Sequence, residues 1–353
     1  MGDRNNDIST DSNGLSGGML TSAGDLFTDL ITGSSIPAPI RKNALKAFGQ
    51  LCSAVIDIPV AYLEGIATEK RAETQARIKI IATSGNQIAN QMNVDPEFAN
   101  AAVKKYSQKI IREQVNLDKI SEIAAQQIHQ DVIDSESKPN ESIDVPMISE
   151  DWLNNFEKEA SQKSTEEMQF LFGKILAGEI QRPSSFSIKT VKLMSELDNT
   201  AAILFRQFCS LSVALKIGDM YIDARVPSLG GNAASNSLQG YSLNFGSLNI
   251  LHEYGLIISD YNSYFDFQMC IVGKNSQPRL SFLYQDRNYV LCPLNGRASN
   301  QEFRLSGIMF SRSGIELLRI IDIQPSPEYI ATAKAIETAI EIAARNAKSA
   351  YAD

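Results

Sequence analysis

The sequence is poor in the residues that most often perform catalysis or bind metals. Its 353 residues include two histidines and four cysteines, which are His129, His252, Cys52, Cys209, Cys270 and Cys292. The cysteines lie far apart and match no spacing of a zinc site or a redox pair, so we expect reduced, buried side chains. Neither histidine has a second ligand at metal spacing. We therefore expect no metal site and no cofactor.

Motifs of the common enzyme classes are missing as well. The chain contains no G-x-S-x-G elbow, Walker A loop, G-x-G-x-x-G turn or H-E-x-x-H helix. Its one glycine-rich loop, at 228–236, lacks the lysine that a phosphate-binding loop uses. Acidic pairs such as Glu150 and Asp151 stand at expected helix starts, where they favour the helix dipole. The sequence therefore indicates a protein that is not an enzyme.

An excess of positive charge and long apolar runs are also absent. Lysine and arginine number 33 against 41 aspartates and glutamates, a net charge of -8. The chain as a whole is thus no electrostatic match for nucleic acid or anionic lipid. The most apolar window, 44–63, contains Lys46, Asp57 and Pro59, so we expect no membrane-spanning helix. The first twenty residues lack the apolar core of a secretory signal, which favours a cytoplasmic location.

The sequence does have long helical periodicity, followed by segments typical of strands. The fold class that this order predicts is α+β, mainly α, with a helical N-terminal two-thirds. Because the long helices bury poorly in a monomer, we expect a homo-oligomer. The predicted segments are a disordered tail (1–18), a helical region with amphipathic and long helices (19–134), a linker (135–148), a helical domain (149–215), an α+β domain (216–324) and a C-terminal helix (325–353).

The α+β third is winged-helix-like in its predicted order of elements. A short helix at 248–254, a turn at Gly255 and a strand follow one another, as in proteins whose helix enters the major groove. That helix carries Glu253 and neither lysine nor arginine, whereas contacts to phosphate need cations. We therefore favour a module that contacts proteins over one that reads DNA.

A cationic amphipathic helix is predicted at 40–56. Its apolar stripe either packs on the helix that follows, as most such stripes do, or lies on a membrane surface or a protein partner. The candidate residues for the second interpretation are Ile40, Arg41, Lys42, Phe48, Leu51 and Val55.

The stretch 171–197 predicts two helices that meet at a sharp break. Pro183 ends the first helix because proline cannot donate a backbone hydrogen bond and disfavours helix at the preceding residue. Ser187 is one of three serines that can cap the second helix. Gly173 and Gly178 lie inside the first helix at a cost of roughly 1 kcal/mol each relative to alanine. Such glycines indicate close packing.

This stretch also resembles an uncharacterised bacterial family allied to the abortive-infection alpha proteins. The match lies in Leu176-Ala177-Gly178-Glu179-Ile180, Pro183 and Ser185-Phe186-Ser187. Segments 251–257 and 311–320 are similar to the C-terminal part of that family, and 37–39 and 61–81 to its N-terminal part. Phe172 stands where the family has tryptophan.

The resemblance implies a bacterial accessory protein of phage defence, a sensor or scaffold without an established activity. It carries over no catalytic residue. An alternative is an effector that acts at the inner membrane through its N-terminal helices. The residues singled out as a structural motif are Leu176, Gly178, Glu179, Pro183, Ser185 and Phe186.

Overall fold

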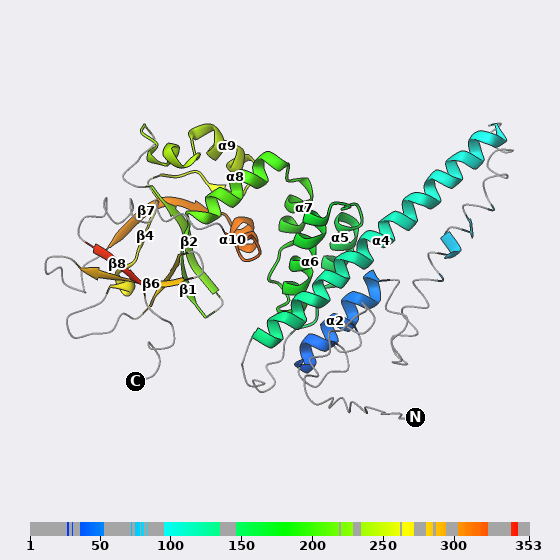
Figure 1. The fold of residues 1–353 in the computed structure, drawn as a ribbon, viewed down its shortest axis with the longest axis horizontal. Coiled ribbons are helices and arrows are strands. Elements are labelled where there is room, and N and C mark those ends of the chain that lie inside the picture. Colours follow the sequence, from blue (N-terminus) through cyan, green and yellow to red (C-terminus); the bar gives the residue numbers. More distant parts are fainter. Residues whose placement is uncertain are drawn as a thin grey trace, which may run out of the picture.

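The computed structural model places a helical part beside a part built on a β-sheet (Figure 1). Its described residues form several separate segments of the chain. The predicted tail and most of the predicted linker lie outside them. The described residues are 27, 30, 36–52, 72, 75–77, 79–80, 83, 95–134, 146–218, 220–228, 234–261, 263–271, 280–284, 287–293 and 303–323, with the backbone alone at 292–293 and 340–344.

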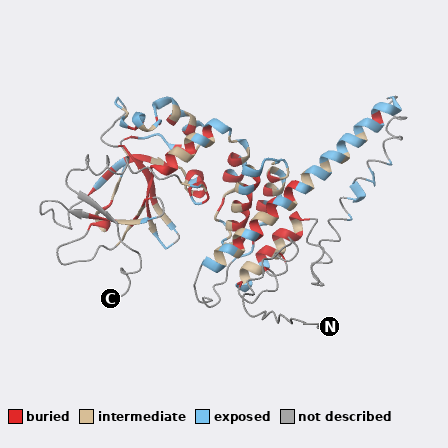
Figure 2. Cartoon of the chain, viewed as in Figure 1, coloured by how far each residue is buried: buried red, intermediate tan, exposed pale blue. Residues whose placement is uncertain are grey.

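The helical part is organised around a long helix, α4, that packs along α6. Helix α4 begins where the sequence predicts, because the Asp95 carboxylate accepts a hydrogen bond from the Glu97 backbone N–H at 2.9 Å. Figure 2 shows its buried residues where it crosses the other helices. The helices here are α2 (Ala38–Leu51), α4 (Pro96–Asp134), α5 (Glu150–Ala160), α6 (Glu166–Gln181), α7 (Ile188–Glu196) and α8 (Asn199–Ser210).

The other part contains an antiparallel sheet, whose described strands run in the order β3-β7-β2-β1-β5-β6-β8, with β4 also paired to β7. Helix α9 leads through Gly255, at a φ of 71°, into β3, which is the helix–turn–strand step that the sequence predicts. The elements are β1 (Val213–Ile217), β2 (Met220–Pro227), η2 (Ser237–Tyr241), α9 (Phe245–Glu253), β3 (Ile257–Ile258), β4 (Tyr264–Asp266), η3 (Gln268–Cys270), β5 (Phe282–Tyr284), β6 (Arg287–Pro293), β7 (Arg304–Phe310), α10 (Arg312–Leu318) and β8 (Ile340–Ala344).

A buried ion pair lies inside the sheet. The Arg225 guanidinium donates to both carboxylate oxygens of Asp223 at 2.6 Å, and to the carbonyls of Ser263 and Leu305 at 3.0 Å. Both side chains of the pair are almost fully buried. Because the guanidinium is satisfied by four acceptor atoms, it links β2 to β7 without leaving a charge unpaired.

The structure confirms the α+β, mainly α fold and corrects two boundaries. The predicted helical domain does not reach residue 215, because α8 ends at Ser210 and β1 begins at Val213, which pairs with Arg225. The predicted C-terminal helix is wrong at Ile340–Ala344, which is strand β8. Its alternation of Ile340, Glu341 and Ile342 also suits a strand, and pairing with β6 satisfies backbone groups at that strand's edge.

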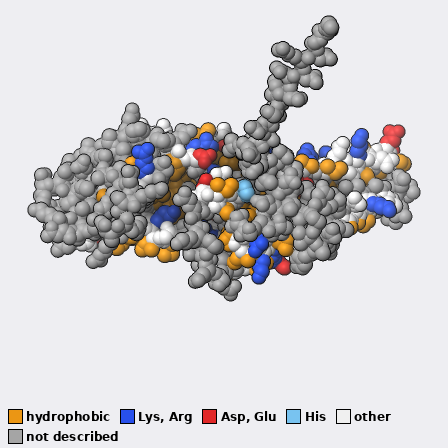
Figure 3. All heavy atoms as spheres, turned by 60° about the horizontal axis from the view of Figure 1, so that its bottom comes forward, with side chains coloured by type: hydrophobic (Ala, Val, Ile, Leu, Met, Phe, Trp, Pro, Cys, Tyr) orange, Lys and Arg blue, Asp and Glu red, His pale blue; other side chains and the backbone are white. Residues whose placement is uncertain are grey.

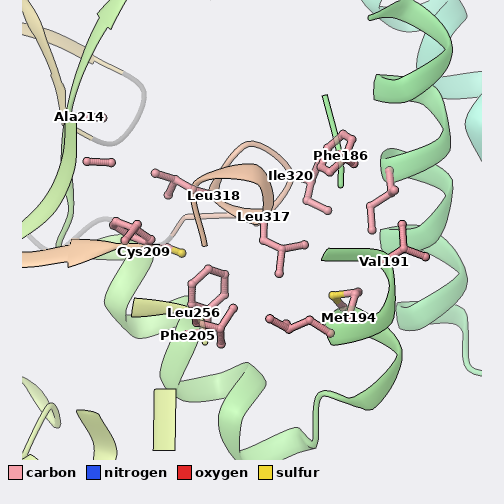
Figure 4. Close-up of a cluster of buried hydrophobic side chains, with 14 of the residues drawn as sticks. Phe186, Val191, Met194, Phe205, Cys209, Ala214, Leu256, Leu317, Leu318 and Ile320 are labelled. Atoms are coloured by element: carbon pink, nitrogen blue, oxygen red, sulfur yellow. The ribbon is translucent and has the colours of Figure 1, made fainter. Parts of the chain in front are cut away.

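Hydrophobic packing continues from the helical part into the sheet part. Helix α10 contacts α7 on one side and β7 on the other. Figure 4 shows buried side chains that meet there, from α7, α8, β1 and α10 and from the residues next to α7, β3 and α10. The labelled ones are Phe186, Val191, Met194, Phe205, Cys209, Ala214, Leu256, Leu317, Leu318 and Ile320.

Candidate functional site

The turn between α6 and α7 is built on the buried carboxylate of Glu179. One oxygen accepts a hydrogen bond from the Ser184 backbone N–H at 2.6 Å and the other from the Phe186 backbone N–H at 3.0 Å. Ser184 adopts a left-handed φ of 71°, a strained conformation for serine that these bonds hold. Burial raises the pKa of the Glu179 carboxyl, against the lowering effect of the backbone donors.

Both interior glycines of α6 lie where a larger residue would collide with a neighbour. A Cβ on Gly178 would lie 2.7 Å from the buried ring of Phe186, and one on Gly173 would lie 2.5 Å from Ile123 of α4. The indole N–H of Trp152, on α5, donates to the Phe186 carbonyl at 2.7 Å. The glycines therefore allow the close packing that the sequence indicates.

The carboxylate of Glu316, on α10, attaches that helix to the start of α7. Its Oε2 accepts from the backbone N–H of Ser187 at 2.6 Å, from the Ser187 hydroxyl at 3.0 Å and from the Thr190 hydroxyl at 2.6 Å. Its Oε1 accepts from Arg312 Nε at 2.9 Å. Ser187 is also the N-cap of α7, as the sequence predicts. We call this assembly of Glu179, Phe186, Ser187 and Glu316 the joint.

A pocket of about 370 Å³ lies beside the joint. Four cationic side chains and one carboxylate line it, together with neutral groups from α4, α6, the turn after α6, β2 and the residues that follow α10. The charged residues are Lys174, Arg182, Lys216, Arg319 and Asp131.

Three of these cationic side chains contact groups in the wall of the pocket. Lys174 Nζ lies 2.9 Å from a carboxylate oxygen of Asp322 and 3.2 Å from the Ile320 carbonyl. Lys216 Nζ lies 4.8 Å from the centre of the Tyr221 ring, and Arg319 Cζ lies 5.5 Å from the same centre. Tyr221 therefore holds two of the cations near one another.

The predicted motif residues are brought together in the structure. Gly178, Ser185 and Phe186 line the pocket, while Leu176 and Glu179 are buried at the joint and Pro183 lies in its turn. Sequence reasoning missed Glu316, although the resembling segment 311–320 contains it, and Trp152, whose helix the resemblance did not include. The pocket cations gave no signal, because they come from distant segments.

The candidate contact residues of α2 do not form an outward apolar face. Phe48 and Leu51 are fully buried, and the Phe48 ring centre lies 4.9 Å from that of Phe27. Ile40 packs partly against the core, Lys42 is exposed and Arg41 is intermediate, whereas Val55 lies outside the described residues. The aromatic and leucine side chains of this stripe belong to the core, which favours packing within the chain over a lipid-facing surface.

The described part of the chain offers neither a membrane-spanning helix nor a cluster of metal ligands. No helix there is both long and apolar enough to cross a membrane. No three His, Cys, Asp or Glu side chains in that part of the chain gather closely enough to hold a metal ion.

Comparison with known proteins identifies a family. No curated protein and no solved structure matches the chain. One family model, described as a protein of unknown function (DUF2806), matches residues 101–334, which run from the first turns of α4 past α10 and include the whole joint. Since this match covers well over half of the sequence, the chain belongs to the DUF2806 family.

Proposed function

We propose that this protein is a non-enzymatic interaction protein, and that it acts as a cytoplasmic sensor or scaffold in bacterial phage defence. The observation that carries the proposal is the joint. The segments on which the resemblance to the abortive-infection alpha proteins rests include the residues that build it, and Glu179, Phe186 and Ser187 each have a hydrogen-bond partner there. A motif that fastens two parts of the molecule together supports a structural role for these residues.

The chemistry of the joint supports this proposal. Two buried carboxylates side by side are otherwise candidates for general acid–base catalysis, and Glu179 has a raised pKa. Both oxygens of Glu179 accept backbone N–H groups, and both oxygens of Glu316 accept from α7 or from Arg312. Carboxylates satisfied in this way organise the backbone, and burial, acting against these donors, accounts for the raised pKa of Glu179 without a reaction.

Helix α4 supplies a surface for assembly. Between Pro96 and Val115 this helix buries Ala99 alone, while its later residues are regularly buried. Figure 3 shows hydrophobic and basic side chains sharing the surface at this end of the molecule. Large side chains there are strongly exposed, with Phe98 at 67%, Tyr106 at 56%, Ile111 at 52% and Val115 at 58%.

One row of residues along α4, which we call the seam, runs from the hydrophobic core into the part of the helix before Val115. Intermediate residues follow one another at spacings of three and four, and the same spacing leads into fully buried positions, as in helices that pair. We propose that a second copy of this chain pairs with this seam, because few described residues pack on this arm and a twenty-residue helix of about 30 Å is marginal in water without tertiary packing. The seam residues are Val103, Ser107, Ile110 and Gln114, followed by Leu117, Ser121, Ala124 and Ile128.

Light scattering tests the assembly. We expect the full chain to have a molar mass at a multiple of 38.8 kDa. Replacement of both Val103 and Ile110 by aspartate should reduce the mass to that of one chain. The matched control replaces Ala101 and Gln108 by aspartate; both are exposed on the opposite face at the same separation, and the mass should stay unchanged. A wild-type protein that remains a single chain at every concentration would refute assembly.

Infection tests the biological part of the proposal. Bacteria that carry the protein should give fewer phage plaques than bacteria that carry the variant with both seam residues replaced. Equal plaque numbers across a panel of unrelated phages would count against a role in defence.

The membrane alternative finds no support in α2, and α9 carries neither lysine nor arginine with which to contact DNA.

A further inference from the structure

We infer that the pocket beside the joint binds a small molecule that carries adjacent phosphate groups. This inference concerns a ligand, and it stands or falls independently of assembly through α4. It rests on the size of the pocket, on the charges that line it and on the way the fold holds those charges.

The size of the pocket suits a small molecule. Its volume of about 370 Å³ lies in the range typical of sites for small ligands, roughly 300–1,000 Å³. Its walls come from α4, α6, the sheet and the residues that follow α10, so that a ligand there would touch both parts of the molecule. A pocket of this size between packed elements favours a small ligand over a polymer.

The charge balance favours an anion. Lys174, Arg182, Lys216 and Arg319 line the pocket, against the carboxylate of Asp131. The two oxygens of Asp131 accept from the side-chain amides of Gln127 and Gln181, at 2.8 and 2.7 Å. Asp322, which contacts Lys174, is 82% exposed, and an exposed pair of this kind contributes only about 0–1 kcal/mol. Among the described residues that line the pocket, with Asp322 added, cations exceed carboxylates by four to two.

Helix ends account for only part of this positive charge. Arg182 and Arg319 follow the last residues of α6 and α10, where cations favour the helix dipole, worth about half a charge at each end. Lys174 lies two turns before the end of α6, and Lys216 lies on strand β1. No helix end explains these two lysines, so the cluster exceeds what capping requires.

The arrangement is also held in place before a ligand binds. Arg319 Nη1 lies 3.5 Å from the Ser185 carbonyl in the joint, and Arg319 and Lys216 share the Tyr221 ring. Guanidinium groups match phosphate oxygens through paired N–H donors, and lysines add point charges. Two arginines and two lysines around one small volume are suited to several phosphate oxygens at once. A single carboxylate would use few of these donors.

Isothermal titration calorimetry of the full chain with pyrophosphate, and separately with ADP, tests this inference. We expect one site per chain and an affinity that falls as salt is added. Replacement of Arg319 by glutamine, or of Lys216 by glutamine, should weaken binding at least about tenfold. Thermal unfolding of each variant establishes that it remains folded. Tighter binding of ADP than of pyrophosphate would identify a nucleotide, and the reverse an inorganic polyphosphate.

A second pocket provides the matched control. It is lined by two lysines and two glutamates, so its charges balance. Lys192→Gln in that pocket removes the same charge and should leave the affinity for both probes unchanged. Absence of binding by the wild-type chain at low salt, or equal weakening by Lys192→Gln and Arg319→Gln, would overturn the inference. Because light scattering reports assembly separately, either proposal can fail without the other.

Discussion

The carboxylate of Glu316 on α10 accepts hydrogen bonds from both the backbone N–H and the hydroxyl of Ser187, which lies 129 residues earlier in the chain. Ser187 stands at the N-terminus of α7, where the first backbone N–H groups have no acceptor within the helix. A carboxylate there also interacts favourably with the positive end of the helix dipole. One buried acid thus completes the N-terminus of one helix while it fastens another helix to it. This contact is the basis of the first prediction.

Glu316→Ala should lower the free energy of unfolding by about 2–4 kcal/mol, because buried donors of α7 lose a charged acceptor. Urea unfolding followed by circular dichroism measures the change. Glu253→Ala, at an exposed position on α9, is the control and should change stability by no more than about 0.5 kcal/mol. Similar stabilities of the two variants would contradict the role of Glu316.

Gly178→Ala should destabilise the protein although alanine favours helix by about 1 kcal/mol. The added methyl would meet the Phe186 ring at 2.7 Å, and overpacking of a core costs about 1–3 kcal/mol. Gly240→Ala is the matched control, since a Cβ there meets nothing within 4 Å. Thermal unfolding should show a lower midpoint for the first variant alone. A stabilised Gly178→Ala would mean that the ring can move aside.

Trp152→Phe should cost about 1–3 kcal/mol, because the buried Phe186 carbonyl would lose its indole donor at 2.7 Å. The phenyl ring keeps most of the apolar contact with Phe156, which stacks on the indole at 5.0 Å. Trp152 is the sole tryptophan, so circular dichroism must replace fluorescence in this measurement. An unchanged midpoint in urea would show that the hydrogen bond contributes little to the joint.

The raised pKa of Glu179 predicts a pH dependence. Between its ordinary value of 4.5 and its higher value in the folded chain, the folded state binds more protons than the unfolded state. The contribution of this residue to stability is therefore present below pH 4.5 and decreases as the pH rises through that window. Glu179→Gln does not titrate. The free energy of unfolding of the wild type relative to this variant should thus be greatest at about pH 4.5 and below, and should decrease towards neutral pH. An increase of this difference towards neutral pH would contradict a raised pKa of Glu179.

Phe48→Ala should destabilise the chain by about 3–5 kcal/mol, since the ring is fully buried against Phe27. Lys42→Ala, an exposed neighbour on the same helix, should change little. Thermal unfolding of both variants checks this. Flotation with anionic liposomes is a second measurement. The folded wild-type protein should not bind the liposomes through α2. Liposome binding by the wild type that is lost in a folded Phe48 variant would restore the membrane interpretation.

Local signals in the sequence predicted much of the fold. Pro183 predicted the break between α6 and α7, and Ser187 the cap, because proline and serine act on their own backbone and its nearest neighbours. Strand β2 and helix α10 follow equally local patterns of residue type. The C-terminal strand β8 was missed because its residues also suit a helix, and its pairing with the distant β6 decides the outcome.

The candidate site was predictable only in part. The motif at Gly178 and Phe186 stood out in the sequence, but its purpose depended on Trp152 and Glu316, which no local pattern connects to it. The pocket cations were unpredictable for the same reason. Lys174, Lys216 and Arg319 are separated by long stretches of chain, and only the packing of α6, β1 and α10 brings them together.

The central claim is that the joint makes the helices and the sheet one cooperative unit. Native-state hydrogen exchange, read by mass spectrometry, tests it most directly. In the wild type, the slowest amides of α6 and of β7 should exchange with the same free energy of opening. Glu316→Ala should lower both by the same amount. Different opening free energies in the wild type, with Glu316→Ala affecting one part alone, would contradict the claim.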